Sequence, residues 1–130
     1  MELTHILVVR DLERSRPWYR DVLGATLTGE YGGSSAVFNF DGAWLLIVTP
    51  GGETPDKPGT AFVPPPDPSK ISHSMTIRVP DCRAAYKMLR SRGAEFLTAP
   101  VESDWEVRCF FRDPDGHLFE ISERKASNTD

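Results

Sequence analysis

The 130-residue sequence has little of what marks a secreted, membrane-bound or nucleic-acid-binding protein. It has two cysteines, Cys82 and Cys109, and a chain of this length can bury a core without disulfides. Its 15 Lys and Arg residues are outnumbered by 19 Asp and Glu residues and form no basic block, which argues against nucleic-acid binding. The apolar stretch at residues 3–9 is too short for a signal peptide or a membrane-spanning helix. We therefore expect a cytoplasmic single domain with reduced thiols that binds neither nucleic acid nor membrane.

Three familiar catalytic motifs are also missing. The sequence has no glycine-rich phosphate loop, no C-x-x-C pair and no G-x-S-x-G elbow. These absences argue against nucleotide-dependent enzymes, zinc ribbons and serine hydrolases.

Proline is unevenly distributed. Seven of the 11 prolines fall within residues 50–70, so this stretch cannot form a helix and separates two halves of the chain. Each half opens with an apolar strand, at residues 3–9 and 71–79. An Asp, a helical stretch and a terminating glycine follow in both halves. The order of elements is therefore duplicated.

The first helical stretch is expected to reach Leu23. If Ser15 caps it, Pro17 lies in the first turn, where its missing N–H costs no hydrogen bond. Each half then continues with strands joined by a glycine-containing turn. The sequence predicts an α+β fold of two βαβββ modules, residues 1–49 and 71–123, with a proline-rich connecting loop at 50–70 and a tail at 124–130.

Three motifs resemble those of one superfamily. They are Asp11-Leu12-x-x-Ser15, Trp18-Tyr19-x-x-Val22-Leu23-Gly24 and Asp113-Pro114-Asp115-Gly116-His117-x-x-Glu120. With the duplicated βαβββ unit, they resemble the vicinal-oxygen-chelate superfamily, which includes glyoxalases, bleomycin-resistance proteins, fosfomycin-resistance thiol transferases and extradiol dioxygenases. The resemblance implies curved sheets with helices on their convex faces and a cup enclosed by paired modules. Fold alone does not settle activity.

The resemblance also implies metal ligands on the first and fourth strands of each module. His5, His73 and Glu120 would then hold an iron, manganese or zinc ion with open positions for substrate oxygens. Glu120 lies four residues after Gly116, at the superfamily's last carboxylate position, and is our candidate catalytic residue and metal ligand. Leu46 aligns with Glu120 in the first module and leaves the fourth ligand position apolar.

Strand register argues against the two histidines. Alternate side chains of a strand face opposite sides of the sheet. The superfamily's ligand usually lies seven residues before the helix-opening Asp, which here gives Thr4 and Ser74. In regular strands His5 and His73 face the helix layer, and His73 is partly buried. Both join the metal site only if both strands carry a β-bulge.

The same alternation identifies the lining of the expected cup. A mainly apolar wall with a few convergent polar groups is typical of a small-molecule pocket. Arg78 is a candidate partner for an anionic ligand group or for Glu120. Cys109 is expected to be a buried, unreactive thiol, and His117 to be exposed beside the turn glycine. The ligand-binding residues that we predict are Thr4, Trp44, Leu46, Ser74, Thr76, Arg78 and Leu118.

Two functions of different classes remain open. In the first, the protein binds a small organic ligand in an apolar cup, with Glu120 as the main polar group and no committed cofactor. In the second, it is a divalent-metal-dependent lyase, isomerase or dioxygenase that uses His5, His73 and Glu120. Strand register favours the first function. We also expect a homodimer, because modules of this length expose sheet edges and an apolar face.

Overall fold

The computed structural model describes residues 1–126. The chain forms two compact units, Met1–Pro68 and Ser69–Asp130. Within the described residues each unit carries one mixed sheet and its own helical segment. The predicted α+β fold is confirmed. Residues 127–130 of the predicted tail lie outside the described residues.

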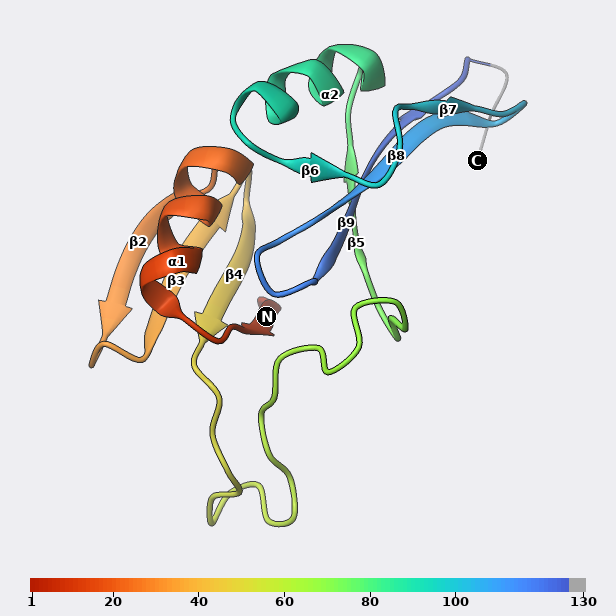
Figure 1. The fold of residues 1–130 in the computed structure, drawn as a ribbon. Coiled ribbons are helices and arrows are strands. Elements are labelled where there is room, and N and C mark those ends of the chain that lie inside the picture. The colour runs from red at the N-terminus through yellow and green to blue at the C-terminus, as the bar shows by residue number, and fades with distance from the viewer. Residues whose placement is uncertain (127–130) are drawn as a thin grey trace. The chain divides into compact units, whose positions relative to one another are not determined.

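The first unit follows the βαβββ order. Its sheet has the strand order β1-β4-β3-β2, with β1 and β4 parallel and the other neighbours antiparallel. Helix α1 packs on one face of this sheet (Figure 1). Buried apolar side chains between helix and sheet, including Leu7, Leu12, Tyr19, Phe38 and Ile47, form the core. The elements are β1 (Thr4–Val8), α1 (Leu12–Pro17), the π-helix η1 (Trp18–Leu23), β2 (Thr26–Tyr31), β3 (Ser35–Phe40) and β4 (Ala43–Val48).

The first helical segment differs from its prediction. Asp11, not Ser15, is the N-cap, because its carboxylate accepts a hydrogen bond from the Glu13 N–H at 3.0 Å, while Ser15 is buried within the helix. Pro17 ends the α-helical part, since it has no N–H to donate to the preceding turn. The chain continues as the wider η1 turn and ends at Gly24, whose φ of 88° suits glycine.

Residues 49–74 link the sheets and, in the structure described, contain neither a helix nor a regular strand. An isolated bridge joins Gly51 to Phe62, and the Arg10 side chain donates a hydrogen bond to the Pro65 carbonyl at 3.0 Å. These contacts attach most of the predicted connecting loop to the first unit. The division at Pro68 falls inside that loop for this reason.

The second unit repeats the plan with its second strand split in two. Its sheet has the order β5-β9-β8-β6, with β7 also paired to β8, and β5 and β9 are parallel. Helix α2 begins after Asp81, whose carboxylate accepts a hydrogen bond from Ala84 N–H at 3.0 Å, and packs against β8 and β9 (Figure 1). The elements are β5 (Met75–Arg78), α2 (Cys82–Ser91), β6 (Glu95–Phe96), β7 (Val101–Glu102), β8 (Glu106–Arg112) and β9 (Leu118–Arg124).

Two boundaries in this unit correct the sequence prediction. The strand expected at residues 71–79 is limited to Met75–Arg78, because the register with β9 begins at the Met75–Phe119 pair. The last strand continues through Arg124, since β8 pairs with it to that residue. A row of aromatic rings fills the core, with centroids 4.7 to 5.4 Å apart, from Tyr86 through Phe96 and Phe111 to Phe119.

Within residues 1–126, we find no helix of the length and apolarity that crossing a membrane requires.

Candidate functional site

The second sheet has one face covered by α2 and one polar face. Val107, Cys109, Phe111, Phe119 and Ile121 are buried on the α2 side. Residues of opposite parity in the same strands lie on the other side. We call six of them the polar face: Thr76, Arg78, Glu106, Arg108, Glu120 and Ser122.

Glu120 is the most buried carboxylate of the polar face, with 9% of the residue exposed. The pairing of β5 with β9 sets Thr76 directly beside it, and Thr76 Oγ1 donates a hydrogen bond to Glu120 Oε1 at 2.7 Å. Arg108 Nη1 lies 3.9 Å from Glu120 Oε2, and the Arg108 guanidinium lies 5.3 Å from the centroid of the Phe110 ring. The Glu120 carboxylate is therefore stabilised by a hydrogen bond from one hydroxyl and by one nearby cation.

Ser122 connects a second pair of charges on the polar face. Its side chain is fully buried and accepts a hydrogen bond from Arg78 Nη1 at 2.8 Å. Ser122 Oγ in turn donates to Glu106 Oε1 at 2.7 Å. A small buried hydroxyl thus fixes an arginine and a glutamate that come from different strands.

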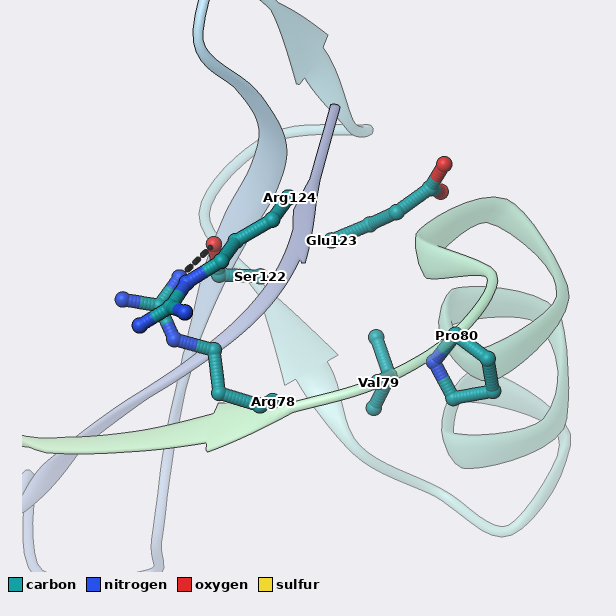
Figure 2. A pocket seen from close by; sticks show the side chains of 6 residues that line it. All are labelled: Arg78, Val79, Pro80, Ser122, Glu123 and Arg124. Carbon is teal, nitrogen blue, oxygen red and sulfur yellow. Dashed lines mark hydrogen bonds between the residues drawn. The ribbon is translucent and has the colours of Figure 1, made fainter. Parts of the chain in front are cut away.

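A pocket of about 430 Å³ lies at the Arg78 end of this face (Figure 2). Its lining includes Arg78, Ser122 and Arg124, which share one side of the sheet, and the chain segment that leads from β5 into α2. The pocket thus combines cationic side chains with the apolar surface of Val79 and Pro80.

The first sheet has an apolar counterpart on the side opposite α1. The register pairs Thr4 with Trp44, Ile6 with Leu46 and Leu46 with Val37, so these side chains share one side. The opposite side carries the buried Leu7, Leu45 and Ile47. We call the following set the apolar face: Ile6, Val37, Trp44, Leu46 and Val48.

The predicted site residues are thus distributed over the two units. Thr4, Trp44 and Leu46 lie together on the first sheet, and Thr76, Arg78 and Glu120 lie together on the second. Leu118 shares the side of Glu120, two residues earlier in β9. Ser74 is exposed and precedes β5, so no strand pairing orients it.

The two histidines do not fit a metal site with Glu120. β1 pairs with β4 in unbroken register and places His5 opposite Leu45, on the α1 side of the sheet. His73 lies before β5 and is exposed, which corrects the expectation of a partly buried residue on a strand. Among the described residues no three His, Cys, Asp or Glu side chains come together as a metal-binding group. Glu120 has a hydroxyl and a guanidinium beside it, whereas iron and zinc favour imidazole or thiolate ligands.

Two further residues occupy buried positions. His117 is 8% exposed, contrary to prediction, because its N–H donates to Asp113 Oδ1 at 2.8 Å and its carbonyl accepts from Asp113 N–H, which draws the turn inward. Cys109 is buried, and burial together with the neighbouring Cys82 raises the pKa of its thiol to about 12. At that pKa the nucleophilic thiolate is scarce at neutral pH.

Sequence reasoning missed Glu106, Arg108 and Arg124 as neighbours of the site. Residues 106, 108 and 110 alternate along β8, and counting from Phe111 as a core residue would have placed them on the side of Glu120. To relate this alternation to Glu120, β8 must also be recognised as the partner of β9, and the hairpin turn at residues 113–116 indicates that pairing.

Comparisons with known proteins agree with this architecture. A model of the Glyoxalase/Bleomycin resistance protein/Dioxygenase superfamily matches residues 2–121, and the chain belongs to that superfamily.

Similar solved structures include proteins with different stated roles. A glyoxalase/bleomycin resistance protein/dioxygenase from Nocardioides has a TM-score of 0.75 at 26% identity, covering 99% of this chain and 86% of that one. The antibiotic-binding protein TnmS3 from Streptomyces has a TM-score of 0.68 at 19% identity, with 96% of each chain covered. The fosfomycin-resistance protein FosX from Listeria monocytogenes, solved with Mn(II), has a TM-score of 0.70 at 18% identity, covering 96% and 91%. Binding proteins and a metal-containing protein thus share the fold.

Proposed function

We propose that the protein binds a small organic molecule on the polar face of its second sheet and that no metal ion takes part. The observation that carries this proposal is the pairing of Glu120 with Thr76, since the carboxylate faces a hydroxyl across the parallel strands instead of an imidazole. A carboxylate held in this way can accept hydrogen bonds from a ligand and orient it. Phe110 and Leu118 on the same side of the sheet supply apolar contact.

The apolar face of the first sheet is a second surface that we propose for ligand contact. Trp44 and Leu46 are partly exposed there, and Ile6 is exposed. Trp44 contributes a large rigid ring, which binds flat organic molecules at low entropic cost. The antibiotic-binding protein TnmS3 supports a binding role by its fold, and the manganese-containing FosX is the precedent for the alternative, a metal-dependent lyase, isomerase or dioxygenase.

The first test compares ligand binding with and without metal. We would titrate the protein with naphthamide, a neutral aromatic amide, before and after EDTA treatment and follow the backbone amide signals by NMR. We expect saturable shifts at Thr76 and Glu120 that are the same in both samples. Glu120→Gln should weaken naphthamide several-fold, because it removes the charged acceptor, whereas Glu95→Gln on exposed β6 should not.

The metal content separates the two functions. Protein purified without chelator should carry well under one transition-metal ion per chain. One ion per chain that is lost in His5→Ala or His73→Ala would contradict the proposal and support the metalloenzyme. Loss of naphthamide binding on EDTA treatment, restored by manganese, would have the same meaning.

A further inference from the structure

The pocket of the second unit forms where β5 leaves the sheet and β9 continues. β5 ends at Arg78, which pairs with Ser122, and β9 runs on to Arg124 beside β8. The edge of β9 and the turn into α2 border an open pocket of about 430 Å³. Figure 2 shows the lining residues: Arg78, Val79, Pro80, Ser122, Glu123 and Arg124.

The two carboxylates near this pocket have other partners. Glu123 Oε1 accepts a hydrogen bond from the Cys82 N–H at the start of α2, at 2.9 Å, and its side chain points toward α2 in Figure 2. There its charge faces the positive end of the helix dipole. Glu106 Oε1 accepts a hydrogen bond from Ser122 Oγ at 2.7 Å. Arg78 itself donates to the uncharged hydroxyl of Ser122, so the positive charge of its guanidinium remains in the pocket.

Arg78 is positioned by a hydrogen bond and has further N–H donors for a ligand. Its Nη1 donates to Ser122 Oγ at 2.8 Å, and Ser122 is itself held by Glu106. A guanidinium has five N–H donors in a rigid plane. Most of them therefore remain for a ligand, and their fork matches the two oxygens of a carboxylate. The pre-set position of the guanidinium reduces the entropy lost on binding.

We propose that this pocket binds the oxyanion of a small organic acid, with Arg78 as its charge partner and Val79 and Pro80 against the adjoining apolar group. The inference rests on the proposed small-molecule binding and names the chemical class of the ligand. A carboxylate satisfies the guanidinium fork, whereas a neutral amide of the same shape offers one oxygen and no charge. The pocket should therefore discriminate by charge.

The test compares three probes with the same naphthalene ring on the native protein: naphthoate, naphthamide of nearly the same shape, and naphthylphosphonate. We expect naphthoate to shift the amide signals of Val79, Ser122 and Arg124 and to bind at least about tenfold more tightly than naphthamide, a difference of 1.4 kcal/mol. Affinity should fall as salt is raised. If naphthylphosphonate binds more tightly than naphthoate, the oxyanion is a phosphonate or phosphate, and if it binds less tightly, a carboxylate; both results support the inference.

Substitutions locate the charge partner. Arg78→Gln should reduce naphthoate affinity at least about tenfold and leave naphthamide affinity within about twofold, and Arg78→Lys should recover part of the loss. Arg83→Gln is the matched control, because Arg83 is an exposed α2 arginine that pairs with Glu102 outside the pocket. Dispersed amide spectra of each variant establish that it is folded.

Two results would overturn the inference. One is equal affinity of the unmodified protein for naphthoate and naphthamide, which requires no variant to fold. The other is unchanged naphthoate affinity in folded Arg78→Gln. In both cases naphthamide binding would leave the proposed function standing, whereas failure of all three probes to bind would remove both proposals.

Discussion

Replacing Thr76 with valine removes one hydroxyl from the polar face and keeps the shape of the side chain. Thr76 Oγ1 donates to Glu120 at 2.7 Å, and the Glu120 side chain is 12% exposed. Valine is also β-branched and suits a strand, so backbone preference changes little. The measured change in stability therefore reports two effects: the loss of the hydrogen bond, and the cost of leaving the Glu120 carboxylate without that donor.

The expected cost is about 1 kcal/mol. A hydrogen bond to a charged group contributes about 1.5 to 3 kcal/mol net. Thr76 is exposed, so water replaces part of the lost bond, and Arg108 stays 3.9 Å from the second Glu120 oxygen. For a domain of this size the cost corresponds to a fall of roughly 3 to 6 °C in Tm.

Thermal and urea unfolding of Thr76→Val, Thr76→Ser, Glu120→Leu and the double variant Thr76→Val/Glu120→Leu would measure this coupling. Serine keeps the hydroxyl and should stay close to the unmodified protein. The double variant should lose less than the sum of its single variants, because neither partner is left unpaired. Thr28→Val is the control, since the Thr28 hydroxyl bonds the Val37 carbonyl at an exposed site, at 3.2 Å. Unchanged stability of Thr76→Val, or strict additivity in the double variant, would refute the reasoning.

Three further predictions concern other parts of the chain. The pKa of the Cys109 thiol is raised from 9.0 to about 12, so the stability that comes from the neutral thiol is complete below pH 9 and is lost as the pH rises through 12. Cys109→Ala should therefore flatten the pH dependence of the free energy of unfolding between pH 9 and 12, measured by urea titration. An unchanged slope in this pH range would count against the prediction. Asp11→Ala and Asp81→Ala each remove a helix cap and should each lower the free energy of unfolding by about 1 kcal/mol, measured by denaturant unfolding. A loss of less than a few tenths of a kcal/mol would show that the caps do not contribute. The homodimer also stays a prediction, and sedimentation that finds only monomer at micromolar concentration would contradict it.

The sequence by itself determined the duplicated plan of the fold. Asp11 and Asp81 begin the helices, Gly24 and Gly93 follow them, and both glycines have positive φ. Such signals are local, because a cap or a left-handed turn depends on a few neighbouring residues. Strand alternation is local too, and it placed His5 on the helix side of its sheet before any contact was known.

Local signals failed where distant residues decide the outcome. Ser15 resembles a cap, yet it is buried in the helix, and Pro17 falls at its end, where the chain turns into a π-helix. His73 belongs to an apolar alternating stretch, but β5 begins only at Met75, where β9 offers a partner. A strand ends where its ladder ends, and the ladder belongs to two segments far apart in the sequence.

The tertiary structure alone brought the charges of the second sheet together. Glu106 and Arg108 come from β8, Glu120 and Ser122 from β9, and Arg78 from β5, and no spacing in the sequence relates all of them. Register between strands sets which hydroxyl meets which charge, and a shift of one residue would turn each side chain to the opposite face. The sequence therefore predicted Glu120, Thr76 and Arg78 as site residues. The pairing of three strands decided that Thr76 and Arg108 lie beside Glu120, whereas Arg78 bonds to Ser122 and lines a pocket at the end of the face.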